Sequence, residues 1–128
     1  MKVRTVGFYK EMPHGQKSSD SIYDFIKKED PKKLDKICGY LKSGLEFVVT
    51  PGMVEDVIHP EKGAAGVPSI YTDGEWFWPG DLAYYVKNYR LKLPDEFVSM
   101  MEKKGWRANV SMDELDCDDI EVDGVKIF

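Results

Sequence analysis

One short stretch places the strongest limit on how this chain can fold. The segment SIYTDGEWFWPGDLAYYVKNY, from Ser69 to Tyr89, holds seven aromatic residues in 21 positions around one Asp-Gly pair. Asp-Gly between alternating apolar residues is a strong hairpin signal, because these residues readily adopt the positive backbone angles of a tight turn. Pro79, Gly80 and Asp81 then end the second strand and begin a helix. The stretch therefore predicts a β-hairpin followed directly by a helix.

The strand alternation sorts the hairpin side chains into two faces. A two-residue turn at 73–74 would place Tyr71 opposite Trp76. Because successive side chains point to opposite faces, Tyr71, Trp76 and Trp78 share one face, and Ile70 and Phe77 share the other. Both faces are apolar. One must pack on the core, and the other must be covered by a second layer or offered to a partner.

The rest of the chain predicts an α+β domain. Apolar residues recur at helical spacing in residues 22–26, 34–41, 82–89 and 97–101. Asp30 before Pro31 is typical of a helix start, and Gly44 of a helix end. Further strands are expected at 2–10, 45–50 and 125–128. Strands and helices are segregated, so we expect an antiparallel or mixed sheet with about four helices mainly on one face.

The length and composition favour one cytoplasmic domain. A chain of 128 residues with 42% hydrophobic content can bury one ordinary core, so residues 1–128 are expected to form a single domain. A signal peptide and a membrane span are not predicted, because no apolar run is long enough. Cys38 and Cys117 lack CxxC or Cys/His spacing, so we expect free thiols, with neither a zinc site nor a cofactor.

Negative charge is concentrated in an acidic C-terminal segment, residues 113–123. Residues 1–112 carry 17 Lys/Arg and 16 Asp/Glu, whereas residues 113–128 carry seven acids and only Lys126 as a base. The spacing of the acids does not fit a calcium-binding EF-hand loop. Two interpretations remain open: a solvated acidic loop, or an anionic surface for a basic partner. The candidate partner-binding acids are Asp113, Glu114, Asp116, Asp118, Asp119, Glu121 and Asp123.

No motif for catalysis or for nucleic-acid binding appears. His14 and His59 lie in loops rich in Gly or Pro, outside any HExxH or nucleophile-elbow pattern. Residues 59–68 are expected to form a mobile loop, a candidate lid, but they lack a phosphate-loop pattern. The aromatic hairpin lies among acids rather than in a basic groove, which disfavours nucleic acid as a partner. We therefore expect a protein that is not an enzyme.

The run from residue 68 to residue 101 resembles a known sequence pattern. It is similar to DGxWxWPxDLAYYxxxYxxxLPxxF, which recurs in small bacterial proteins, some of which resemble immunity proteins of toxin systems. The resemblance implies a small cytoplasmic α+β protein without catalytic residues, and it transfers no binding residues. It covers about a quarter of the chain. The matching residues are Asp73, Gly74, Trp76, Trp78, Pro79, Asp81, Leu82, Tyr84, Tyr85, Tyr89, Leu93, Pro94 and Phe97.

These features together predict a non-enzymatic bacterial immunity protein. It would neutralise a cognate protein toxin, such as a nuclease, because an acidic surface suits a basic cleft. Trp76, Trp78 and Tyr84 are the candidate aromatic anchors, although we expect at least two of them to belong to the core. The alternative is a cytoplasmic adaptor that binds a protein or a small ligand through the aromatic hairpin. Neither a nucleic acid nor a membrane is expected as a partner.

Overall fold

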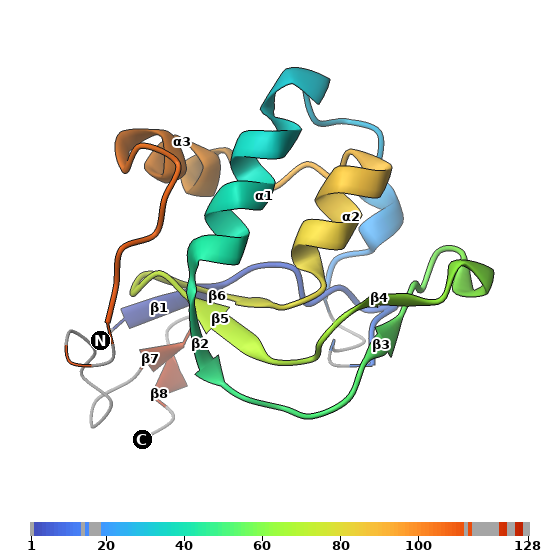
Figure 1. Cartoon of the computed structure of the whole chain (residues 1–128), viewed down its shortest axis with the longest axis horizontal. Coiled ribbons are helices and arrows are strands. Elements are labelled where there is room, and N and C mark those ends of the chain that lie inside the picture. The colour runs from blue at the N-terminus through green and yellow to red at the C-terminus, as the bar shows by residue number, and fades with distance from the viewer. Residues whose placement is uncertain are drawn as a thin grey trace.

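A mixed β-sheet forms the base of the molecule (Figure 1). The computed structural model describes residues 2–13, 15, 19–111, 113, 121–122 and 125–126. Strand β1 runs parallel to β6 and β7, and the other neighbouring strands are antiparallel. The strands follow the order β2 (Leu45–Val48), β5 (Ile70–Thr72), β6 (Trp76–Pro79), β1 (Lys2–Thr5), β7 (Glu121–Val122) and β8 (Val125–Lys126).

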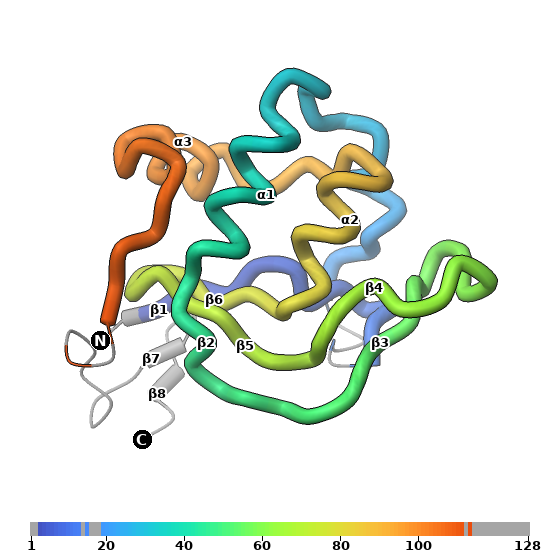
Figure 2. The backbone as a smooth tube through the Cα atoms, in the orientation of Figure 1, coloured from blue at the N-terminus to red at the C-terminus, as the bar shows by residue number. Residues whose placement is uncertain are grey.

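Helices complete an α+β domain, as predicted. The described residues form the α-helices α1 (Leu34–Ser43), α2 (Leu82–Tyr89) and α3 (Asp95–Lys103), and the 3-10 turns η1 (Ile22–Asp24), η2 (Pro31–Lys33) and η3 (Pro60–Lys62). Helices α1 and α2 lie side by side above β5 and β6 (Figures 1 and 2). The expected fourth helix, at 22–26, is absent from the described α-helices.

The chain at 22–26 forms a 3-10 turn because its backbone bonds to a distant segment. Lys27 has a left-handed conformation, with φ of 62°, which a continuing α-helix does not allow. Its N–H group donates to the carbonyl oxygen of Tyr89 at 2.7 Å. The N–H groups of Lys28 and Glu29 both donate to the carbonyl oxygen of Arg90. Residues 27–29 therefore satisfy carbonyl groups at the end of α2 instead of extending a helix of their own.

The hairpin turn is longer than predicted, but the two faces are as expected. Tyr71 pairs with Trp78 rather than with Trp76, so the predicted two-residue turn is wrong. The Asp73 carboxylate explains the longer turn, because it accepts the N–H groups of Glu75 at 2.8 Å and Trp76 at 2.7 Å. The register moves by two residues, and a shift of two keeps every side chain on its face.

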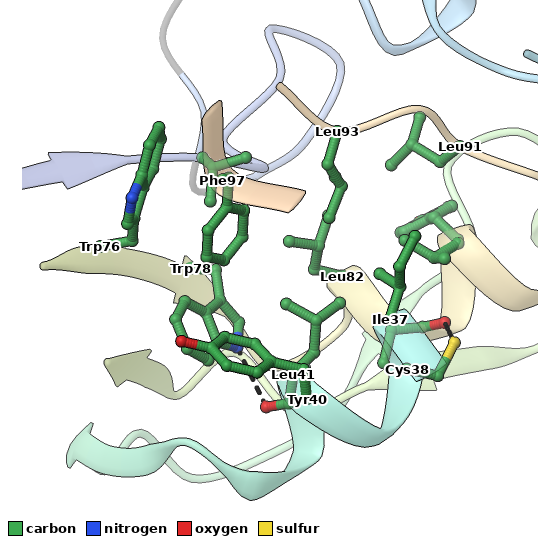
Figure 3. Packing of buried hydrophobic residues seen from close by; sticks show 14 of the residues in the cluster. Ile37, Cys38, Tyr40, Leu41, Trp76, Trp78, Leu82, Leu91, Leu93 and Phe97 are labelled. Carbon is green, nitrogen blue, oxygen red and sulfur yellow. Dashed lines mark hydrogen bonds between the residues drawn. The ribbon is translucent and has the colours of Figure 1, made fainter. Parts of the chain in front are cut away.

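The aromatic face of the hairpin forms the centre of the main core (Figure 3). The Trp78 indole N–H donates to the carbonyl oxygen of Leu41 in α1 at 3.2 Å. The Phe97 ring, from α3, lies 4.7 Å from Trp76 and 5.5 Å from Trp78 between centroids. The opposite face carries a smaller cluster around Phe77, whose ring stacks on Phe47 at 5.2 Å. Helix packing thus covers one hairpin face.

The limits of α1 agree with the sequence signals. The Asp30 side chain accepts the N–H group of Lys32, and Pro31 occupies the first turn of η2, which leads into α1. Gly44 ends the helix with an ordinary φ of −65°, so its backbone angle does not require glycine. A Cβ atom there would lie only 2.4 Å from Cζ2 of the Trp78 ring. Close packing is therefore the reason for glycine at this position.

Replacing Gly44 with alanine is expected to lower the free energy of unfolding by about 1–3 kcal/mol, because the buried Trp78 ring must move. Gly39, in the same helix, is the matched control, since an added Cβ there has no atom within 4 Å. Gly39→Ala is expected to raise stability by about 0.5–1 kcal/mol through helix propensity. Urea unfolding monitored by circular dichroism measures both. Equal effects of the two substitutions would contradict the packing of Gly44 against Trp78.

Candidate functional site

A two-stranded ribbon projects beside α2, at the right of Figure 1. It consists of β3 (Val54–Glu55), η3 and β4 (Ala64–Gly66), with β3 and β4 antiparallel. Residues 59–68, which we expected to be an irregular mobile loop, thus contain a 3-10 turn and a strand. The amide of Asp56 donates to the carbonyl oxygen of Gly63 at 3.0 Å and continues the ribbon beyond its ladder.

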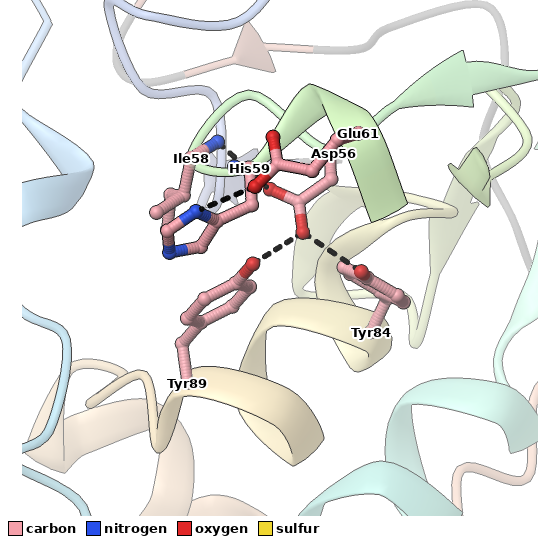
Figure 4. Close-up of polar contacts among 6 residues, drawn as sticks. All are labelled: Asp56, Ile58, His59, Glu61, Tyr84 and Tyr89. Atoms are coloured by element: carbon pink, nitrogen blue, oxygen red, sulfur yellow. Dashed lines mark hydrogen bonds and ion pairs between the residues drawn. The ribbon is translucent and has the colours of Figure 1, made fainter. Parts of the chain in front are cut away.

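Three tyrosines of α2 hold this ribbon. Tyr85 is fully buried and accepts the N–H group of Val57 through its hydroxyl oxygen at 2.9 Å. The same hydroxyl lies 3.4 Å from the carbonyl oxygen of Glu55 and can donate to it. Tyr84 and Tyr89 are half-buried, and both direct their hydroxyl groups at Asp56 (Figure 4).

Asp56 is the centre of the site and is fully buried. Its Oδ1 atom accepts the N–H groups of Ile58 and His59, each at 2.8 Å. Its Oδ2 atom accepts the hydroxyl groups of Tyr84, at 2.7 Å, and Tyr89. Both carboxylate oxygens therefore receive two hydrogen bonds each, and these bonds join the ribbon to α2. Burial of a carboxylate is tolerated only when it is satisfied in this way.

The hydrogen bonds also set the ionisation of this cluster. Burial alone would raise the pKa of Asp56, but the donors, led by the Tyr89 hydroxyl, together lower it below the usual value of an aspartate. The same contacts raise the pKa of Tyr89 and of Tyr84, first through burial and then through the bond to Asp56. The carboxylate is therefore ionised, and the tyrosines protonated, across the physiological pH range.

Two residues of the ribbon contact the ring of Tyr89: His59, which precedes η3, and Lys62, within η3. The His59 ring stacks on the Tyr89 ring with 5.9 Å between centroids, and the Lys62 ammonium lies 5.0 Å from that ring. His59 Nδ1 lies 3.2 Å from a carboxylate oxygen of Glu61 in an exposed pair. His59 is exposed, as expected, and its contacts hold it to the ribbon. His14 lies outside the described residues.

We call Asp56 and the four groups that donate to it the latch, because their hydrogen bonds join the ribbon to α2. A general base needs a free lone pair directed at a substrate proton, whereas the four hydrogen bonds to Asp56 occupy both of its oxygens. A second buried aspartate, Asp73, is also committed to the fold: it accepts the Tyr40 hydroxyl at 2.6 Å besides its turn bonds. Within the described ranges, His, Cys, Asp and Glu side chains form no group of three that could hold a metal ion.

The structure places two of the predicted anchors in the core. Trp76 is 5% exposed and Trp78 is 1% exposed. The Arg4 guanidinium covers the Trp76 ring, 4.3 Å from its centroid, and also pairs with Glu96. The expectation that at least two of the three anchors belong to the core is confirmed. Tyr71, on the same face of the hairpin, is half-buried.

The remaining predicted site residues fall into two groups. Tyr84 is half-buried, and its hydroxyl is already bound to Asp56. In the acidic segment, Asp113 is exposed and Glu121 belongs to β7. The other acids lie outside the described residues: Glu114, Asp116, Asp118, Asp119 and Asp123.

Sequence reasoning missed Asp56. The pattern of the fragment MVEDVI around it fits a strand and a short helical turn equally well, although an aspartate just before a turn is a signal for side-chain capture of backbone N–H groups. Its tyrosine partners could not be found this way, since Tyr84 and Tyr89 lie 28 and 33 residues further along the chain. The same tyrosines explain part of the matched string as architecture: they hold the ribbon.

The comparisons with known proteins gave no match: no family model fits the chain, and neither a curated protein nor a solved structure resembles it significantly. In the part of the chain that the structure describes, no helix combines the length and the apolar character required to cross a membrane. The resemblance to immunity proteins therefore stays a prediction from the string of residues 68–101.

Proposed function

We propose that this chain is a cytoplasmic binding protein, most simply a bacterial immunity protein that neutralises a cognate toxin by direct association. The segregation of charge carries the proposal. Seven of the 23 acidic residues lie in the last 16 residues, which contain one lysine, whereas the rest of the chain is nearly neutral. Such a local excess of one sign speeds encounter with a basic partner and favours it over acidic ones. A nuclease, which binds phosphates through a basic cleft, is the class of toxin that fits best.

The described part of the chain supports a scaffold role in this proposal. The buried aspartates 56 and 73 are both committed to hydrogen bonds that hold the backbone. The two tryptophans are packed against the helices. In this proposal the helices lie mainly on one face of the sheet, as α1 and α2 do in Figure 1, and the acidic segment binds the toxin. The toxin is neutralised by occlusion of its substrate-binding face, without chemistry.

The test reverses the charge of the acidic segment. A variant with Asp116, Asp118, Asp119 and Glu121 replaced by lysine is expected to bind the cognate toxin at least 100-fold more weakly at low salt, because the attraction becomes repulsion. The matched control reverses four exposed acids elsewhere, which changes the net charge equally: Asp24, Asp35, Glu55 and Glu102. Calorimetry or surface-plasmon resonance measures both affinities.

The identity of the partner must be fixed first. A toxin domain encoded immediately upstream of this chain would be the candidate, to be tested by pull-down with the purified proteins, whereas a solitary gene among metabolic genes would count against the immunity role. Unchanged affinity of the acidic-segment variant at low salt would refute the acidic surface while leaving an immunity role possible. Failure of the native chain to bind that toxin at any salt concentration would refute the immunity role itself.

A further inference from the structure

An aromatic cleft lies at the carboxyl end of β1, away from the cluster around Asp56. Its volume is about 550 Å³, within the range of small-ligand sites. Three segments line it: residues 5–9, which follow β1; residues 19, 20 and 25; and residues 92–95, which lead into α3. Ligand sites often form at the carboxyl ends of parallel strands, and β1 is parallel to both of its neighbours.

The walls of the cleft are aromatic and apolar. Tyr9 is 7% exposed, and its ring lies 5.8 Å from the ring of Phe25 at an angle of 39°. Phe8 is half-buried beside them, and the buried Leu93 contributes to the lining. The face of an aromatic ring carries negative partial charge. Such walls attract apolar groups and cations, and they disfavour anions.

Carboxylates outnumber cations at the rim. Among the described lining residues, Asp20 and Asp95 are acidic and Lys92 is basic. The Lys92 ammonium lies 3.0 Å from a carboxylate oxygen of Asp95. That hydrogen bond raises the pKa of Lys92, and the nearby charge of Glu29 acts in the same direction, so the lysine stays charged and paired. Because Lys92 and Asp95 neutralise each other, Asp20 is the lining acid whose charge the Lys92–Asp95 pair does not offset.

The Asp20 carboxylate also acts on the aromatic wall. The pKa of Tyr9 is raised by burial and, in addition, by the negative charge of Asp20. A carboxylate close enough to oppose ionisation of the tyrosine favours a positive charge at the same place. Asp20 is itself exposed, and its backbone carbonyl oxygen accepts the N–H group of Lys10, which fixes its position at the rim.

We propose that this cleft binds a cationic group on an apolar stem, a guanidinium or an ammonium, with Asp20 as its counter-ion and Tyr9 and Phe25 as its aromatic walls. A charged hydrogen bond to Asp20 and cation–π contact with the rings act on the same cation, while the apolar walls hold its stem. The site is separate in sequence from the acidic segment and does not depend on the identity of a toxin.

The test titrates the full ¹⁵N-labelled chain with Nα-acetyl-arginine methylamide and follows the backbone amide shifts. Saturable shifts are expected at residues 5–9, 19–25 and 92–95, with a dissociation constant of about 1–10 mM, as for a small ligand with few contacts. The neutral citrulline analogue has the same shape without the charge, and it should bind at least tenfold more weakly. Agmatine, which lacks the peptide groups of the arginine probe, distinguishes two kinds of ligand. Binding at least as tight as that of the arginine probe indicates a free small-molecule cation, and weaker binding indicates a side chain of a protein.

Variants distinguish the site from weak general association. Asp20→Asn is expected to weaken arginine binding at least fivefold, because it removes the counter-ion and leaves an exposed side chain of the same size. Asp24→Asn is the matched control, since Asp24 is an exposed acid of η1 outside the cleft. Equal binding of arginine and citrulline, shifts confined to other parts of the chain, or unchanged affinity of Asp20→Asn would overturn the proposal.

Discussion

Replacing Asp56 with alanine is expected to lower the free energy of unfolding by about 3–5 kcal/mol. The substitution leaves the hydroxyl groups of Tyr84 and Tyr89 and the N–H groups of Ile58 and His59 without their acceptor. Each unsatisfied buried donor costs about 1–3 kcal/mol, but opening of the ribbon to water limits the total. Urea unfolding measures the stability, and hydrogen exchange of residues 57–59 measures the opening.

Two controls separate the latch from a general effect of removing an acid. Glu55→Ala removes a neighbouring acid that is exposed, and it should change stability by no more than about 0.5 kcal/mol. Tyr84→Phe removes a single hydrogen bond to the carboxylate and should cost about 1.5–3 kcal/mol. Additive effects of Asp56→Asn and Tyr84→Phe in a double-mutant cycle would contradict their direct interaction.

The pH dependence of the same latch has a definite sign. The pKa of Asp56 is lower in the folded state than the value of about 3.9 expected in the unfolded state. Its contribution is therefore complete above the unfolded value and is lost as the pH falls through the folded value. The stability difference between the native chain and Asp56→Asn should stay constant from neutral pH down to about pH 5 and then shrink in acid. A difference that grows in acid would contradict the lowered pKa.

Replacing Trp78 with alanine is expected to cost about 3–5 kcal/mol, comparable with the largest effects of core truncation. Trp78 is 1% exposed and lies between α1 and α3, where it contacts the rings of Tyr40 and Phe97. Alanine leaves a cavity and also leaves the Leu41 carbonyl oxygen without the indole donor. A typical domain has a total stability of about 5–15 kcal/mol, so this variant is expected to be partly unfolded at physiological temperature.

Trp78→Phe keeps the assignment testable when the alanine variant does not fold. It should cost about 1–3 kcal/mol, since it retains most of the packing and loses the hydrogen bond. Val49→Ala is the exposed control: Val49 is 72% exposed, and its truncation should cost no more than about 0.5 kcal/mol. Equal losses for Trp78→Phe and Val49→Ala would show that Trp78 is not a core residue. An unchanged affinity of folded Trp78→Phe for a toxin would show that the Trp78 ring does not contribute to toxin binding.

The substitutions of Asp56 and Trp78 test the fold, whereas the charge substitutions in the acidic segment and at Asp20 test partner binding. Most of the matched string of residues 73–97 packs in the core, directs a turn or holds the ribbon, so its specificity as a string reports architecture. The charged candidates for partner contact, the acidic segment and Asp20, lie outside that string. Both places can be tested by charge substitutions that leave the core unchanged.

Local patterns predicted the elements well where the interactions are local. The helices α1, α2 and α3 follow the periodic segments, and Asp30 caps η2 at the start of α1 through contacts within three residues. The hairpin faces are also correct, because alternation depends only on neighbouring residues. The register of the hairpin was wrong, because the Asp73 side chain competes for the N–H groups of the turn and adds two residues to it.

By itself, the sequence determined the segments, their faces and the concentration of acids after residue 112. The tertiary structure decided which polar groups share a site. Asp56, between β3 and η3, meets hydroxyl groups of α2 only after α2 and the ribbon pack together. In the same way, residues 25 and 27–29 form backbone hydrogen bonds with residues 89, 90 and 92, where a continuing helix was expected. Periodicity reports the environment of a residue along its own segment. Hydrogen bonds between distant segments depend on packing, which no local pattern specifies.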